Sequence, residues 1–207
     1  MSEFLLSNEP FVRLAAFGSV FTLMAIWEVL APRRNQVIPR ATRWPSNIGG
    51  VILDTAIVRI LFPTTAVGLA LLAEAQGFGL FNAWKVPYAL SVVASVAILD
   101  FVIYLQHVLF HAVPSLWRLH RMHHADLEFD LTTGARFHPI EIMLSMLIKL
   151  AVIAALGAPA VAVLIFEVLL NATAMFNHSN VRLPARVDRL LRWFVVTPDM
   201  HRVHHSV

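Results

Sequence analysis

Histidine is the residue whose number and spacing stand out in this sequence. Eight of the ten histidines fall into one HxxxH motif and two HxxHH motifs, at residues 107–111, 120–124 and 201–205. Because residues three and four positions apart share one face of a helix, the imidazoles of each motif should converge. Convergent imidazoles are typical of sites for iron, zinc, copper or nickel. The three motifs therefore predict a metal site.

The composition limits both the site and the class of protein. The 207 residues are 58% hydrophobic, with a mean hydropathy of +0.69, whereas soluble domains are roughly 45–50% apolar. The chain has no cysteine, which excludes thiolate zinc sites and iron–sulfur clusters, so nitrogen or oxygen must hold any metal. The net charge is +3, but the arginines flank apolar segments. That arrangement favours a membrane surface over nucleic acid as the partner.

Apolar segments divide the chain as expected for a helical membrane bundle. We predict transmembrane helices at residues 10–30, 48–75 and 88–112, each long enough for a bilayer core of roughly 30 Å. Residues 140–176 are too long for one span and contain Gly157-Ala158-Pro159 near their middle. A transmembrane or re-entrant helical hairpin is therefore expected there. The chain is interpreted as one all-α membrane domain.

This topology places every histidine motif at one side of the membrane. Residues 31–47, 113–139 and 177–207 share that side and hold 12 of the 16 basic residues. The positive-inside rule makes that side cytoplasmic. We expect a multi-pass protein, in the cytoplasmic membrane if bacterial, with a cytosolic histidine-rich cap. The metal-binding segments of this cap are residues 113–139 and 177–207.

Polar residues inside the predicted spans follow the same helical spacing. Asp100, Tyr104, His107 and His111 are separated by 4, 3 and 4 positions and should line one face. Asp100, acting through Tyr104, could accept the outer ring N–H of a ligand histidine and fix its orientation. The alternative is that Asp100 belongs to a buried polar network. A similar stripe in the returning arm consists of Glu167, Asn171 and His178.

The ordered motifs resemble those of the fatty acid hydroxylase/sterol desaturase superfamily, integral-membrane di-iron oxygenases with histidine motifs. The resemblance covers roughly residues 95–207 and rests on Trp117–His124, Phe137–Glu141, Phe176–Asn180 and Thr197–Ser206. Some members carry a further histidine where this chain has Ala174, a role that we expect His138 to fill. The metal ligands implied by the resemblance are His107, His111, His120, His123, His124, His138, His178, His201, His204 and His205.

The resemblance implies a function as well. It implies two iron ions, which zinc can replace in isolated protein, and O₂ as co-substrate. The reaction would hydroxylate, or desaturate, a C–H bond of a lipid such as a fatty acyl chain or a sterol. Electrons would come from a separate NAD(P)H-linked donor protein. Members continue beyond the last HxxHH motif, so we expect a chain that stops at Val207 to be truncated.

Two other functions fit parts of the pattern. A bis-histidine haem protein for membrane electron transfer needs only one or two axial pairs, and it would show a Soret band. A non-catalytic metal-binding or transport protein would need ligands along a path through the membrane, whereas these gather at one side. The absence of an HExxH motif removes the glutamate base of a zincin protease.

Overall fold

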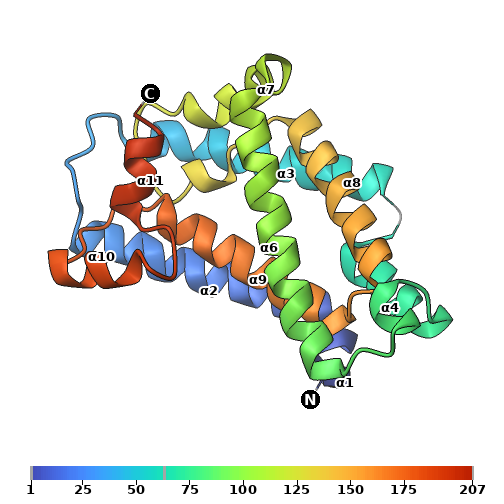
Figure 1. Ribbon diagram of the computed structural model, residues 1–207. Coiled ribbons are helices and arrows are strands. Elements are labelled where there is room, and N and C mark those ends of the chain that lie inside the picture. The colour runs from blue at the N-terminus through green and yellow to red at the C-terminus, as the bar shows by residue number, and fades with distance from the viewer. Residues whose placement is uncertain (1, 63, 207) are drawn as a thin grey trace.

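The computed structural model describes residues 2–62 and 64–206 (Figure 1). Within these residues the secondary structure is helical, and an isolated bridge joins Pro32 and Val181. The all-α fold class predicted from the sequence is therefore confirmed. The helices are α1 (Ser2–Ser7), α2 (Glu9–Leu30), α3 (Arg40–Leu61), α4 (Ala66–Gln76), α5 (Leu80–Ala83), α6 (Tyr88–Ala112), α7 (Pro114–His124), η1 (Thr133–Ala135), α8 (Pro139–Leu156), α9 (Ala160–Asn177), α10 (Ala185–Leu191) and α11 (Pro198–His204).

Among the described residues, five segments are long and apolar enough to cross a membrane, as expected for a multi-pass bundle. They are Glu9–Leu30, the stretch from Arg40 to Ala83 that holds α3, α4 and α5, Tyr88–Ala112, Pro139–Leu156 and Ala160–Asn177.

The helix bounds differ from the expected ones in the second span. The predicted segment 48–75 contains parts of two helices, because α3 ends at Leu61 and α4 begins at Ala66. Pro63, inside that predicted span, lies outside the described residues, as does Val207, where we expected a truncation. The division of the chain into membrane-crossing segments remains a prediction.

Residues 140–176 form the two helices α8 and α9 on either side of a Gly-Ala-Pro turn. Gly157 ends α8 with a φ of 63°, a left-handed conformation that glycine adopts readily. Pro159 then precedes the first residue of α9. The two helices diverge from this turn, and α6 packs against both (Figure 1). The expected pair of helices is thus present, but its two arms diverge instead of packing along each other.

Small residues allow close helix packing around α9. Ala66 and Ala70 of α4, Ala160 of α9, and Leu99 of α6 are almost fully buried in one core cluster. Because alanine adds little width, neighbouring backbones approach closely, as is common between membrane helices.

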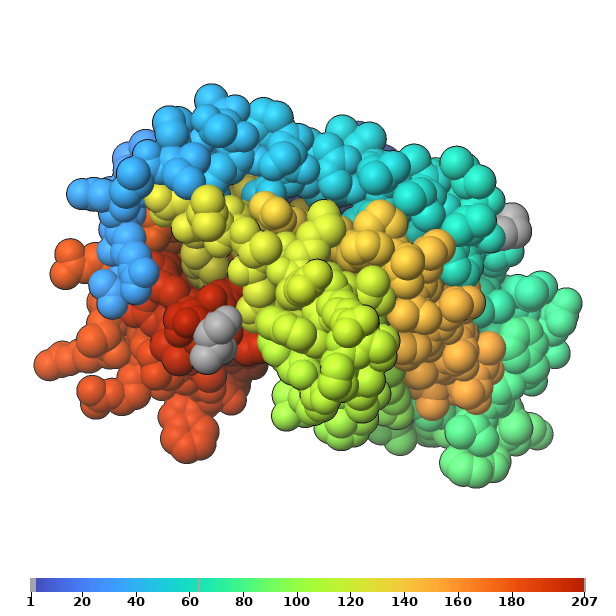
Figure 2. Space-filling model, turned by 90° about the horizontal axis from the view of Figure 1, so that it is seen from above, coloured from blue at the N-terminus to red at the C-terminus, as the bar shows by residue number. Residues whose placement is uncertain are grey.

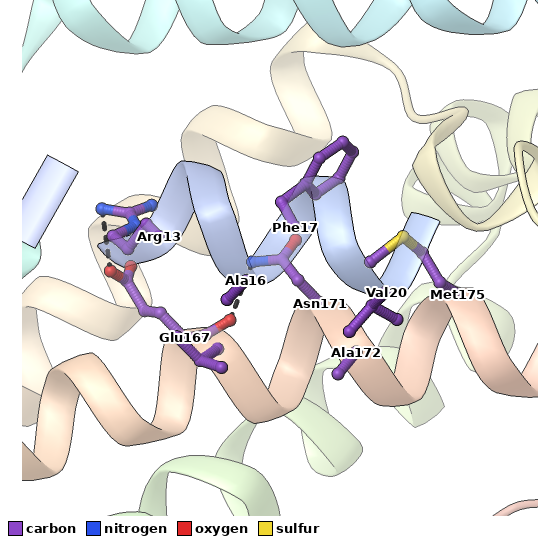
Figure 3. Close-up of a pocket in the computed structure, with 9 residues that line it drawn as sticks. Arg13, Ala16, Phe17, Val20, Glu167, Asn171, Ala172 and Met175 are labelled. Carbon is purple, nitrogen blue, oxygen red and sulfur yellow. Dashed lines mark hydrogen bonds and ion pairs between the residues drawn. The ribbon is translucent and has the colours of Figure 1, made fainter. Parts of the chain in front are cut away.

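The polar stripe of α9 joins helices instead of serving the histidines. Glu167 forms ion pairs with Arg13 of α2 at 3.1 Å and with Lys149 of α8 at 2.6 Å. Figure 3 shows Arg13 pointing from α2 toward Glu167, with Asn171 one turn further along α9. Asn171 donates to the backbone oxygen of Glu167 at 2.7 Å. Of the three stripe residues, His178 alone meets the histidine cluster described below.

Three connecting segments meet at one end of the helices. Arg33 N–H donates to the backbone oxygen of Asn180 at 2.8 Å, and Val37 N–H donates to Glu128 Oε1 at 2.6 Å. From above, the segment near residue 40 (blue), the segment near residue 130 (yellow) and the chain end near residue 200 (red) gather together (Figure 2). The segments expected on one side of the membrane thus form a single cap. Its cytoplasmic location remains a prediction.

The α8–α9 turn fits against a second glycine, and this contact yields a stability prediction. Gly79 has φ 95° and ψ 162°, a region essentially restricted to glycine. A Cβ there would meet the backbone of Gly157 and lie 2.7 Å from the carbonyl carbon of Leu156. We expect Gly79→Ala to destabilise the fold by roughly 3 kcal/mol, from backbone strain plus overpacking. Denaturant titration in detergent micelles measures this.

Gly77→Ala is the matched control. Gly77 also has a positive φ, of 70°, but a Cβ there has nothing within 4 Å. It should lose only about 1 kcal/mol, from strain alone. Equal losses in the two variants would contradict the close packing of the turn.

Candidate metal centre

Nine of the ten histidines converge in the cap. They include two groups of four, within each of which the candidate ligand atoms all lie within 4.8 Å of one another. The first group consists of His107, His111, His120 and His204. The second group consists of His123, His178, His201 and His205. His124 lies between the two groups of four. It forms one set of three with His120 and His123 and another set of three with His204 and His205.

Four separate elements supply these side chains. The end of α6 carries the HxxxH motif, and α7 carries the first HxxHH motif. His178 follows α9 as its C-cap, and α11 with the residue after it carries the last motif. Proline starts both α7 and α11 at their first position, where its missing N–H does no harm. Histidines three and four positions apart converge on one face of α7, as expected: the His120 ring centroid is 5.1 Å from those of both His123 and His124.

The orientation of two rings is fixed by backbone carbonyls. His178 Nδ1 lies 2.7 Å from the oxygen of Ala174, and His123 Nδ1 lies 3.2 Å from the oxygen of Arg136. A carbonyl only accepts, so both Nδ1 atoms carry the proton. Both Nε2 atoms then present lone pairs, yet they are only 3.0 Å apart. Two facing lone pairs repel each other, and a cation bound by both Nε2 atoms would remove the repulsion.

Glu141 fixes a third ring. Its Oε1 lies 2.7 Å from His120 Nδ1, and both side chains are buried. His120 Nδ1 therefore donates to the carboxylate and directs its Nε2 inward, as in carboxylate–histidine–metal arrangements. We did not assign this role from the sequence, although Glu141 lies in the same short motif as His138.

Several ring nitrogens are buried without a hydrogen-bond partner among the described residues. Buried polar atoms normally have partners, so these atoms point to a ligand. They are His111 Nε2, His120 Nε2, both ring nitrogens of His124, and His205 Nε2. Each of these nitrogen atoms can bind a metal ion, and nitrogen ligands suit iron or zinc. The residues present thus fit a metal centre.

Aromatic side chains enclose the cluster. Phe137 stacks on His123 with ring centroids 4.5 Å apart and an interplanar angle of 7°. Phe129 lies against His178 and His205, at 5.6 and 5.2 Å. Trp117 covers His111 and His124 on the other side. These rings cover part of the cluster, in which His120, His123 and His178 are buried, and lower exposure to water strengthens electrostatic interactions there.

Burial keeps the histidines neutral. It lowers the pKa of His201 to about 3 and that of His205 to about 2, and repulsion from neighbouring imidazoles adds to the shift. Burial, followed by neighbouring imidazoles, also holds the pKa values of His123 and His178 well below the usual range. At neutral pH the rings therefore offer lone pairs to a cation.

Three residues differ from the expected arrangement. Asp100 is exposed and Tyr104 is 59% exposed, so among the described residues neither hydrogen-bonds to a histidine. The reason is that α6 is 25 residues long and only its last turns reach the histidine cluster. His138 lies outside both groups. Its Nδ1 accepts from Ile140 N–H at 3.2 Å and caps α8.

The depressed pKa values predict acid sensitivity of the metal-free protein. In the unfolded chain a histidine takes up a proton near pH 6.5, whereas the pKa values of His124 and His201 in the folded chain are about 3. The unfolded state therefore binds more protons in this window, and stability falls as the pH drops below about 6.5. Melting temperatures of chelator-treated protein at several pH values check this. His178→Phe should make the dependence shallower, and a pH-independent melting temperature would contradict the expectation.

Comparison with known proteins is consistent with this geometry. The model of the fatty acid hydroxylase family matches residues 92–207, which carry all ten histidines. Ornithine lipid hydroxylase OlsE of Rhizobium tropici is 31% identical over 120 residues, 58% of this chain and 35% of the relative. The chain thus spans about a third of the length of that relative. No solved structure matches the chain.

The family match covers more than half of the chain and includes every element that supplies a histidine to the cluster. The protein belongs to the fatty acid hydroxylase family.

Proposed function

We propose that the protein is a membrane oxygenase that hydroxylates a C–H bond of a lipid at a di-iron centre. The observation that carries this proposal is the pair of facing lone pairs on His123 and His178, 3.0 Å apart. With both outer nitrogens donating to backbone carbonyls, neither of these two Nε2 atoms can donate a hydrogen bond to the other. A cation bound by both Nε2 atoms would relieve the repulsion between their lone pairs.

Nine histidines supply the ligands in this proposal, and His138 does not. Two groups of four suit two ions better than one, since a single ion takes about four such ligands. Iron is the metal we propose because an all-nitrogen site with open positions favours oxygen chemistry. Zinc is the expected substitute in isolated protein.

The bound irons would supply O₂ activation, so that a lipid C–H, O₂, two electrons and two protons give a lipid C–OH and water. The chain itself orients three of the ligands through Glu141 and the two carbonyls, and its aromatic rings cover part of the site. The electrons come from a separate NAD(P)H-linked donor protein in this proposal, because we find no second redox site in the described residues.

The substrate we propose is a membrane lipid. The relative bears the name ornithine lipid hydroxylase, and both comparisons name hydroxylation, which we favour over desaturation. The apolar segments that are long enough to cross a membrane support this proposal, because a membrane protein and a lipid substrate would share the bilayer. We propose that the cap faces the cytoplasm, as the distribution of basic residues indicates.

A haem site fits the geometry less well. A porphyrin needs an open slot between two axial nitrogens, whereas facing Nε2 atoms here lie 2.9 Å apart for His107 and His204 and also for His178 and His201. Lipidomics of cells expressing the protein under isotope-labelled O₂ tests the function. One labelled oxygen atom in a lipid product is expected, and a Soret band in the purified protein would contradict the proposal.

Removing single ligands should remove metal. His123→Ala in the second group and His204→Ala in the first are each expected to lower bound iron and to abolish the hydroxylated product. Metal analysis of the purified variants, with lipidomics, measures both. His138→Ala is the matched control and should keep its metal. Unchanged metal in both ligand variants would refute the ligand assignment.

Removing the carboxylate behind His120 should weaken the metal centre without destroying it. Glu141→Gln keeps the shape of the side chain but replaces a charged acceptor with a neutral one. We expect the affinity for metal to fall about 10- to 100-fold, the effect usual for partners of ligand histidines. Competition with a chelator measures this. Equal affinity in Glu141→Gln and the parent protein would show that the carboxylate does not tune the site.

A further inference from the structure

Exposed side chains on and just after α10 take no part in the metal centre. Leu190, Trp193 and Phe194 are 64%, 82% and 79% exposed, and Val187 is 43% exposed. Exposed arginines lie among them. We call the whole set the α10 patch, which comprises Arg182, Arg186, Val187, Arg189, Leu190, Trp193 and Phe194.

The α10 patch is amphipathic. Val187 and Leu190 are three positions apart and lie on one face of α10, Phe194 lies in the turn just after the helix, and Arg186 and Arg189 lie on the face beside the apolar one. Asp188 is buried on the face that packs against the protein. Among the described residues, the three arginines of the patch form no ion pair. Their charge is therefore free for an external anion.

The start of this segment is tied to the end of a membrane-crossing helix. Val181 pairs with Pro32 in the isolated bridge, and Arg182 N–H donates to the oxygen of Ala31 at 2.9 Å. Leu30 is the last residue of α2. Figure 1 shows α10 beside that end of α2. The α10 patch thus lies where α2 leaves the apolar part of the bilayer.

We infer that the α10 patch docks on the surface of the same bilayer, through anionic phospholipid head groups and the acyl region beneath them. A basic stripe beside an apolar stripe is the pattern of a helix lying in the membrane interface. Arginine attracts anionic lipids there, and tryptophan favours the boundary between head groups and chains.

This contact would affect the metal centre indirectly. The chain runs from Phe194 through a few residues into α11, which carries His201 and His204. Docking of the α10 patch would restrict the segment that delivers these ligands. The inference goes beyond the proposed oxygenase function, because the contact does not require metal or activity.

Spin labelling tests the inference. The sequence has no native cysteine, so a spin label attaches only to a cysteine that is introduced. Leu190→Cys and Ala185→Cys each carry the only thiol, and Ala185 is an exposed residue of the same helix, outside the apolar stripe. The full chain is reconstituted in vesicles of phosphatidylcholine with phosphatidylglycerol. Relaxation of each label by O₂, which concentrates in lipid, is compared with relaxation by a water-soluble nickel chelate.

The ratio of O₂ to nickel relaxation should be several-fold higher at residue 190 than at residue 185. Equal ratios would overturn the inference. A label at residue 190 shielded from both reagents, in detergent as well as in vesicles, would mean that protein covers the patch, and would also overturn it.

Charge reversal tests the role of the arginines. Arg186→Glu with Arg189→Glu should lower the ratio at residue 190 to near that at residue 185. The matched control, Arg118→Glu with Arg121→Glu, reverses two exposed charges on α7 and should leave the ratio unchanged. An unchanged ratio in the α10 variant would refute the attraction to anionic lipid. Every readout is independent of metal and turnover, so failure here is distinguishable from failure of the proposed function.

Discussion

The histidine cluster depends on one constraint that is met at three of its rings: an imidazole directs one nitrogen inward as a lone pair when its other nitrogen donates to an acceptor outside. The backbone oxygens of Ala174 and Arg136 serve His178 and His123, and the Glu141 carboxylate serves His120. These acceptors lie on different elements from one ring to the next. The positions of the helices relative to one another therefore set the chemistry of the site as much as the histidines do.

A buried polar scaffold holds those elements in place. Glu28, at the end of α2, accepts from Leu131 N–H at 2.8 Å and from Asn180 N–H at 2.7 Å, and it pairs with Arg40. One carboxylate thus joins the end of α2, the loop after α7 and the segment that follows His178. A buried ion pair is weak support for stability alone, but losing one partner leaves an uncompensated charge. The scaffold therefore favours one arrangement of the cap.

The sequence predicted what local spacing determines. Histidines three and four positions apart do share helix faces, and Gly157-Ala158-Pro159 does separate two helices. The acceptors behind the rings were not predictable, because a backbone oxygen has no signature in the sequence and Glu141 resembles an ordinary acid in the first turn of a helix. Asp100 was a reasonable candidate by spacing, but spacing does not reveal where a long helix leaves the cluster.

The same constraint explains why the cluster lies at the end of the bundle. Inside apolar spans the backbone oxygens are used by the helices themselves, so few acceptors are left for a ring N–H. Helix ends leave the last carbonyls free, and the oxygen of Ala174, near the end of α9, accepts from the ring of His178. A cap assembled from helix ends and loops can therefore supply the acceptors that orient His120, His123 and His178.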